Sequence, residues 1–218
     1  MKPGTIIPLA VTLRREEVLR LLGYPEEREP PRRIGTLLES AFTEARGLVR
    51  ARGTYLRLPK SRATEVRLPP VEAQALTVGL VTAGAELEGR VAELADAGDL
   101  TRALLLDAMG SAAAEEAADR LSAIISAGGE TDAPAAGCRL SPGYGDWPLA
   151  AQTSLFALLP SQEVGVSLLP SMLMQPRKSV SFAMWLGARG IPAPGLSGCE
   201  RCGLVTCRYR RKPRSEPQ

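Results

Sequence analysis

The chain has 218 residues and a mass of 23.2 kDa, which is enough for one large domain or two small ones with a sizeable core. Aromatic residues make up only 4% of the chain, so Leu, Val and Ala must build most of that core. Histidine is absent, which excludes a histidine general base, a histidine metal ligand and any Ser-His-Asp or Cys-His catalytic set. The net charge of +3 is local, because residues 208–218 carry +4 and the remaining body carries −1.

The sequence contains no pattern typical of a targeting or membrane segment. The apolar run over residues 5–10 is short and is interrupted by Pro8, whereas a secretory leader has a longer apolar core. Other apolar runs are broken well before the roughly 18 residues of a membrane helix. Three of the four cysteines lie near the C-terminal end, which argues against a disulfide framework. We therefore expect a cytoplasmic protein.

The first half of the chain predicts two helices followed by three strands. The spacing of leucines and the glycine that follows them, Gly23, predict a helix over residues 13–22. A charged, proline-rich connector precedes a second predicted helix over residues 36–52. Strands are predicted from alternating, β-branched or continuous apolar residues over 54–58, 64–68 and 75–82. The run over 75–82 is apolar enough for a strand that is buried on both faces.

The second half predicts helices and then strands. Residues 85–97 and 100–125 have helical apolar spacing, and Asp99 is placed to cap the second of these helices. A loop over residues 128–136 and a turn-rich segment follow. A short helix is predicted from Pro148 to residue 159, with Asp146 as its cap, and strands over 164–169 and 179–186. This order has no regular βαβ alternation, so we predict an α+β fold with a mainly antiparallel sheet.

The most distinctive motif is Arg139-x-x-x-Gly143-Tyr144, which crosses a Pro-Gly turn. A guanidinium and several backbone amides held this way can bind one small anion or carboxylate. The other interpretation is a tight turn between a strand and a helix, with Arg139 in a surface salt bridge.

The same residues resemble a known signature. Arg139-x-x-x-Gly143-Tyr144 is similar to the S-adenosylmethionine-binding motif in the activation domain of cobalamin-dependent methionine synthase. Residues 171–181 resemble that family's Ser-x-x-Met-x-Pro-x-x-Ser-Val-Ser segment. Upstream, the resemblance continues through residues 16–24, 81–84, 98–99 and 114–121, so it covers most of the chain.

The resemblance implies a fold, a ligand and a partner. In this family the domain binds S-adenosylmethionine, which methylates the cobalamin after one-electron reduction of the inactive cob(II)alamin. Here it implies that Arg139 holds the ligand's carboxylate and that Glu115 meets its cationic end, with Ser141, Gly143 and Tyr144 lining it. The alternative for Glu115 is a solvated side chain on an alanine-rich helix. Without histidine the chain lacks the Asp-x-His-x-x-Gly cobalamin signature, so the corrinoid would come on a partner.

The chain also departs from the family pattern. Leu169 and Pro170 stand where the family has Thr-Glu, and two ligand contacts of the family, an early Asp and a late Tyr, have no clear counterpart. The resemblance implies an activation-like domain over residues 1–196. A cysteine-rich segment and a basic tail follow over residues 197–218.

The cysteines form a second candidate site. Cys199-x-x-Cys202-x₄-Cys207, with Cys138 as a possible fourth thiolate, suits zinc or an iron–sulfur cluster. The alternatives are unligated thiols or a Cys199–Cys202 redox pair. An iron–sulfur cluster would offer a relay for the electron that reactivation needs. The basic tail is compatible with nucleic acid or an acidic partner, but we expect a solvated end.

Three functional hypotheses follow. The first is a stand-alone reactivation factor for a corrinoid methionine synthase, working with an electron donor and needing no acid–base catalyst of its own. The second is a metal-binding interaction module. The third is an S-adenosylmethionine-binding protein that does not act on cobalamin.

Overall fold

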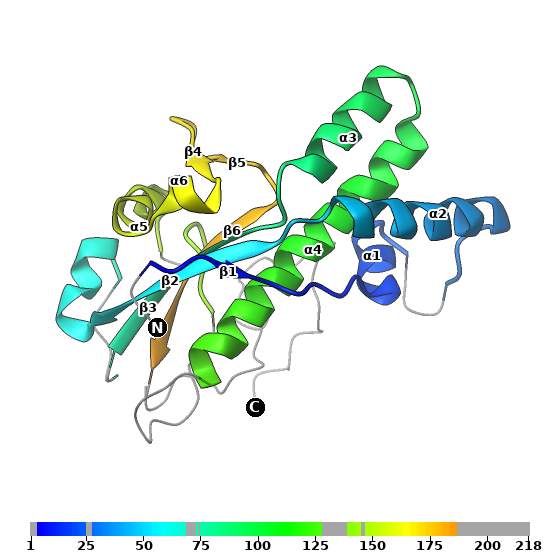
Figure 1. Cartoon of the computed structure of the whole chain (residues 1–218). Helices are drawn as coiled ribbons and strands as arrows, with labels where there is room; N and C mark the ends of the chain where they lie inside the picture. The colour runs from blue at the N-terminus through cyan, green and yellow to red at the C-terminus, as the bar shows by residue number, and fades with distance from the viewer. Residues whose placement is uncertain are drawn as a thin grey trace.

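The computed structural model describes residues 4–24, 28–68, 73, 75–127, 139–144 and 147–186. Within these residues an antiparallel sheet runs through the centre of the molecule, in the order β1–β2–β3–β6 (Figure 1). Its strands are β1 (Ile7–Pro8), β2 (Arg52–Pro59), β3 (Ala75–Thr82) and β6 (Ser179–Leu186). Helices cover both faces. The predicted α+β class with a mainly antiparallel sheet is therefore confirmed.

Strand β3 is the centre of the core. All of its residues are buried, as the continuous apolar run predicts for a strand covered on both faces. Its register with β6 pairs Leu76 with Trp185 and Gly79 with Phe182. Because side chains alternate along a strand, Trp185 and Phe182 belong to separate apolar clusters on opposite faces.

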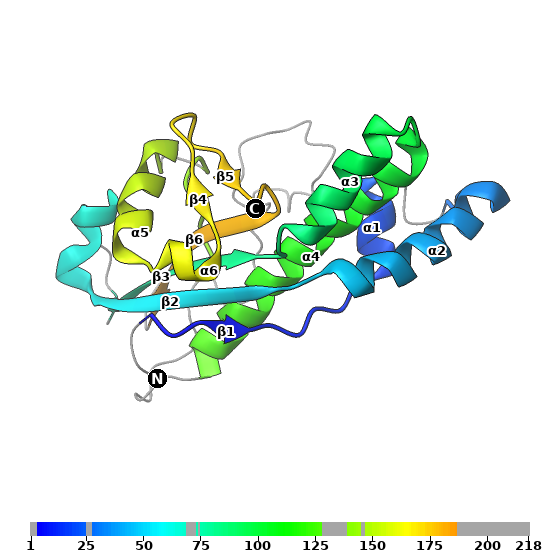
Figure 2. The ribbon, with the colours of Figure 1, turned by 45° about the horizontal axis from the view of Figure 1, so that its top comes forward.

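Short helices and one long helix cover the two faces (Figures 1 and 2). One face packs against η1 (Lys60–Val66), η2 (Leu149–Ala151), α5 (Gln152–Leu158) and α6 (Ser161–Val164). The other face packs against α4 (Leu100–Ala127), chiefly through Ala117, Ala118 and Leu121. Small alanines let the helix axis approach the sheet closely. The alanine-rich face of the sequence is thus mainly a packing surface.

The N-terminal half of α4 lies in a helical region at one end of the sheet. There α1 (Arg15–Leu21), α2 (Arg32–Leu48) and α3 (Glu86–Asp96) bury Leu38, Leu87, Leu106 and Met109 in one cluster (Figure 1). Several predicted boundaries hold. Gly23 follows α1 with a positive φ of 85°, and the Arg102 amide donates a 3.2 Å hydrogen bond to Asp99, which caps α4.

Helix α2 begins and ends earlier than predicted. It starts at Arg32 and stops at Leu48, because the chain turns extended at Val49 and enters β2 at Arg52. The N-terminal run over residues 5–10, to which no strand was assigned, supplies the short edge strand β1. Its pairing of Ile7 with Gly53 shows that the run is part of the sheet.

Two predicted strands are wrong. Residues 64–68 overlap the 3₁₀ helix η1, whose buried Ala63 and Val66 are spaced three apart, the period of that helix. The alternation that suggested a strand is coincidental. Residues 164–169 form only the two-residue strand β4 (Ser167–Leu168), paired with β5 (Met174–Gln175). Gly165, with φ 79°, ends α6 inside the predicted strand.

No helix among the described residues is both long and apolar enough to cross a membrane. Several predictions fall on residues 128–138, 145–146 and 187–218, which lie outside the described residues. These are the loop over 128–136, the cap Asp146 and the boundary between residues 196 and 197.

Candidate functional site

The structure brings the two charged residues of the predicted ligand site together. The Nη2 of Arg139 donates a 2.7 Å hydrogen bond to Oε2 of Glu115, and its Nη1 lies 3.2 Å from Oδ1 of Asp119. The guanidinium carbon also lies over the Phe182 ring, 5.8 Å from its centroid. We call these four residues the Arg139 cluster.

The fold explains why residues so far apart in sequence meet. Leu140 and Ala183 exchange two backbone hydrogen bonds, of 2.9 and 2.8 Å, which attach the segment around Arg139 to the free edge of β6. Leu140 packs against the apolar cluster on the face of the sheet that α5 covers. Because neighbouring side chains in an extended segment point to opposite faces, Arg139 points toward α4. Glu115 and Asp119 lie one helical turn apart on α4 and therefore face Arg139 together.

The Arg139 cluster is partly shielded from water and carries a net charge of −1. The side chain of Arg139 is 18% exposed, whereas those of Glu115 and Asp119 are 39% and 46% exposed. Two carboxylates around one guanidinium leave an excess of negative charge that favours a cationic group nearby. A guanidinium in this setting can in turn bind a carboxylate through two N–H donors. The cluster can thus hold a zwitterion.

The turn after Arg139 is closed by its own backbone. The Gly143 amide donates to the carbonyl of Trp147 at 2.8 Å, and the Tyr144 amide donates to that of Ser141 at 3.1 Å. Gly143 has φ 90°, a conformation in which glycine is favoured. These two amides are therefore committed to the turn, contrary to the prediction that they are presented to an anion. Tyr144, which follows Arg139 by five residues in the sequence, is 56% exposed.

Arg139 and Glu115 meet as the sequence predicts, but in a different setting. Arg139 does form the salt bridge that the second interpretation expects, but it is largely buried and is shared between two carboxylates. Glu115 is an ion-pair partner of Arg139, although its side chain remains 39% exposed. Asp119 and Phe182 were missed as site residues. The four-residue spacing from Glu115 to Asp119 signals a shared helix face, but nothing local marks Phe182.

The predicted metal site cannot be placed. Cys138, Cys199, Cys202 and Cys207 all lie outside the described residues. The part of the chain that the structure describes holds no group of three or more His, Cys, Asp or Glu side chains that could hold a metal ion.

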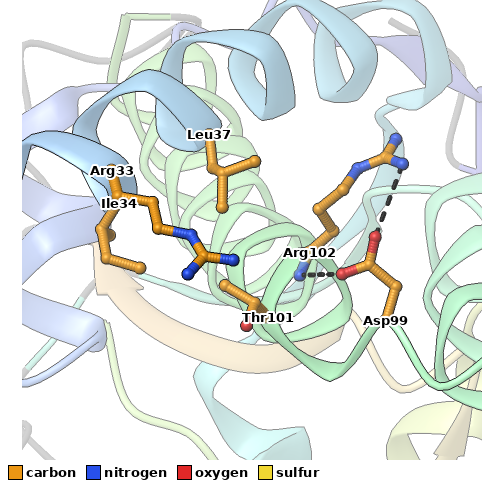
Figure 3. Close-up of a pocket in the computed structure, with 6 residues that line it drawn as sticks. All are labelled: Arg33, Ile34, Leu37, Asp99, Thr101 and Arg102. Carbon is orange, nitrogen blue, oxygen red and sulfur yellow. Dashed lines mark hydrogen bonds and ion pairs between the residues drawn. The ribbon is translucent and has the colours of Figure 1, made fainter.

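A separate hollow of about 400 Å³ lies between α2 and the start of α4 (Figure 3). Its lining includes none of the predicted site residues and consists of Arg33, Ile34, Leu37, Asp99, Thr101 and Arg102. Asp99 and Arg102 interact with each other, and Arg102 also donates to Glu44 at 2.7 Å. Two of the three charged residues that line the hollow are therefore already paired within the helical region. We take the Arg139 cluster as the candidate site.

Comparisons with known proteins bear on the fold. No protein-family model matches the sequence, and no curated protein matches it. A solved structure does: the crystal structure of the MetH reactivation domain bound to AdoHcy, with a TM-score of 0.60 and 16% identity. The match covers 84% of this chain and 79% of that chain. The chain has the fold of the MetH reactivation domain. At this identity the likeness extends to the fold alone.

Proposed function

We propose that the chain binds S-adenosylmethionine at the Arg139 cluster and reactivates a separate cobalamin-dependent methionine synthase. The observation that carries this proposal is the pairing of Arg139 with Glu115, from two distant segments, in a fold shared with a domain solved with bound AdoHcy. The motif resemblance and the fold likeness both point to the same family of domains.

The residues present fit such a ligand. S-adenosylmethionine ends in an amino acid with one carboxylate and one ammonium group, next to a sulfonium. Arg139 binds the carboxylate in this proposal, and Glu115 binds the ammonium group. The net charge of the ligand is +1, which complements the −1 of the cluster. The bound ligand supplies a methyl group, and the chain positions it without needing a general acid or base.

Calorimetry with S-adenosylmethionine and with S-adenosylhomocysteine tests the binding step. The wild-type chain is expected to bind both, and Glu115→Gln to bind each about tenfold more weakly because a charged hydrogen bond is lost. Asp107 lies on α4, the helix that also carries Glu115, and its carboxylate is 2.7 Å from Nζ of Lys178, between β5 and β6. Asp107→Asn is therefore a matched control that should leave both affinities unchanged. If the wild type gives no heat of binding with S-adenosylmethionine and none with S-adenosylhomocysteine, the proposal is refuted.

Exposed apolar side chains next to the turn support a docking partner. Tyr144, Leu149 and Leu173 are 56%, 47% and 58% exposed. The Leu149 side chain lies against Gly143, and the β4–β5 hairpin that carries Leu173 is held to α5 by a 2.8 Å hydrogen bond from Gln152 to the Met172 carbonyl. Large apolar side chains exposed in this way favour a protein partner, which in this proposal is the corrinoid-bearing methionine synthase.

A reactivation assay separates the proposed function from simple ligand binding. A methionine synthase lacking its own reactivation domain is converted to cob(II)alamin and incubated with this chain, a reductant and S-adenosylmethionine. Recovery of activity that depends on this chain is expected. A chain that binds the ligand but restores no activity would be an S-adenosylmethionine-binding protein of another kind.

The cysteine motif supports an additional metal site, which we keep as a proposal of its own. Four thiolates from Cys138, Cys199, Cys202 and Cys207 would suit zinc or an iron–sulfur cluster. Anaerobic purification followed by zinc and iron analysis tests it. A colourless, metal-free protein with four titratable thiols excludes both metals.

A further inference from the structure

The proposed function leaves Asp119 without a role, although its carboxylate lies 3.2 Å from the Arg139 guanidinium. We propose that Asp119 is an internal competitor: it occupies a carboxylate position on Arg139, and the carboxylate of an incoming ligand must displace it. The inference rests on the proposed function, because it requires that Arg139 bind the ligand's carboxylate.

The geometry limits how a ligand can reach Arg139. The guanidinium carbon lies over the Phe182 ring, 5.8 Å from its centroid, so the ring closes one direction of approach. A carboxylate must therefore approach along the edge of the guanidinium, where the N–H donors point. On that edge Nη2 already donates to Glu115 and Nη1 already faces Asp119. A ligand carboxylate that binds Nη1 and Nη2 together has to replace one of these two acids.

Asp119 is the acid that is more easily displaced. Its contact is an ion pair of 3.2 Å, whereas the Glu115 contact is a 2.7 Å hydrogen bond. The Asp119 side chain is also more exposed, at 46% against 39%, so water can solvate it once it is released. Glu115 can then remain beside Arg139 and receive the ammonium group of the ligand.

This arrangement selects the amino acid end of the ligand. A nucleoside thioether without a carboxylate does not displace Asp119, and it gains nothing from Arg139. A ligand with both a carboxylate and an ammonium group replaces Asp119 on Arg139 and adds a contact with Glu115. Asp119 thus lowers the affinity for every carboxylate-bearing ligand while leaving the affinity of ligands without a carboxylate unchanged.

The test compares Asp119→Asn with the wild type, using two ligands in calorimetry. S-adenosylhomocysteine, whose net charge is zero, is expected to bind about threefold to fivefold more tightly to the variant. The reason is that its carboxylate no longer competes with the partly exposed Asp119–Arg139 ion pair. 5′-Methylthioadenosine, which lacks the amino acid, is expected to bind both proteins equally. Asp119→Ala must show the same gain, and thermal unfolding of each variant confirms that it is folded.

The outcomes separate this inference from the proposed function. If the wild type binds S-adenosylhomocysteine and Asp119→Asn binds it equally or more weakly, Asp119 is not a competitor and the proposed function stands. An equal gain for both ligands also overturns the inference, because the effect is then not directed at the carboxylate. If none of the proteins binds S-adenosylhomocysteine, the proposed function fails and the inference with it.

Discussion

Two charged clusters in this molecule are near mirror images in composition. In the helical region, Glu44 accepts hydrogen bonds of 2.7 Å from both Arg90 and Arg102, so one acid lies between two guanidinium groups. In the Arg139 cluster, one guanidinium lies between Glu115 and Asp119. The Glu44 cluster joins three helices, α2, α3 and α4, whereas the Arg139 cluster joins α4 to the edge of the sheet.

The difference between the clusters separates a structural role from a binding role. The pKa of Glu44 lies below its usual value, chiefly because Arg90 donates a hydrogen bond to its charged form, with Arg102 adding to the effect against the opposing burial. Its two arginines also contact Glu93 and Asp99, so these two guanidinium groups and three carboxylates together carry −1. The Arg139 cluster also carries −1, but there two carboxylates share a single guanidinium, which suits a site that receives a cationic group.

The largest effect is expected when the guanidinium is removed from each cluster in turn. Arg139→Met should weaken S-adenosylmethionine binding by about 100-fold, because two charge-assisted hydrogen bonds to the ligand are lost. Arg102→Met should leave that affinity unchanged and lower the free energy of unfolding by about 1 kcal/mol. Calorimetry and chemical denaturation of both variants measure the two effects. If Arg102→Met weakens ligand binding as much as Arg139→Met, the division of roles is wrong.

The next effect concerns the aromatic support that only the Arg139 cluster has. A Cβ added at Gly79 would lie 2.5 Å from Cζ of Phe182, so Gly79→Ala must displace the ring over which the Arg139 guanidinium lies. We expect a loss of about 1–3 kcal/mol in unfolding free energy from overpacking, together with weaker ligand binding. Gly47→Ala on α2, where an added Cβ meets nothing within 4 Å, is the control and should leave ligand binding unchanged without lowering the unfolding free energy, because alanine favours the helix more than glycine does. Unaltered stability of Gly79→Ala would show that the ring moves freely.

The smallest effect is the pH dependence of the Glu44 cluster. Because folding lowers the pKa of Glu44, its stabilising contribution is present above the ordinary value of 4.5 and is lost as the pH falls below it. Glu44→Gln should therefore lower the unfolding free energy by about 1 kcal/mol at pH 7, with the difference from wild type closing as the pH falls through the lowered pKa of Glu44. Denaturation curves at pH 7 and at a series of acidic pH values measure it.

Glu29 provides a control for this pH dependence. Its carboxylate contacts Arg15 at 2.6 Å but is 77% exposed, so water screens the pair. Glu29→Gln should change stability much less than Glu44→Gln at pH 7. A gap between wild type and Glu44→Gln that persists unchanged at low pH would contradict an origin in the charge of Glu44.

The predictions that the structure confirms rest on patterns whose physical requirement is local to a few neighbouring residues. The apolar run of β3, the glycine after α1 and the cap at Asp99 each act within a few residues, so their physical requirements are visible in the sequence. The strand predicted over residues 64–68 failed because alternating and three-residue spacings coincide over so short a segment. Tertiary packing of Ala63 and Val66 decided between them.

The chain's composition and motifs determined the class of fold, the absence of histidine chemistry, and Arg139 and Glu115 as candidate ligand contacts. Only the tertiary structure decided that these two residues pair with each other and that Asp119 and Phe182 complete the cluster. The physical reason is that α4 and the edge of β6 are brought together by the sheet, and no local pattern encodes that meeting. The excess negative charge of the Arg139 cluster arises from this long-range packing.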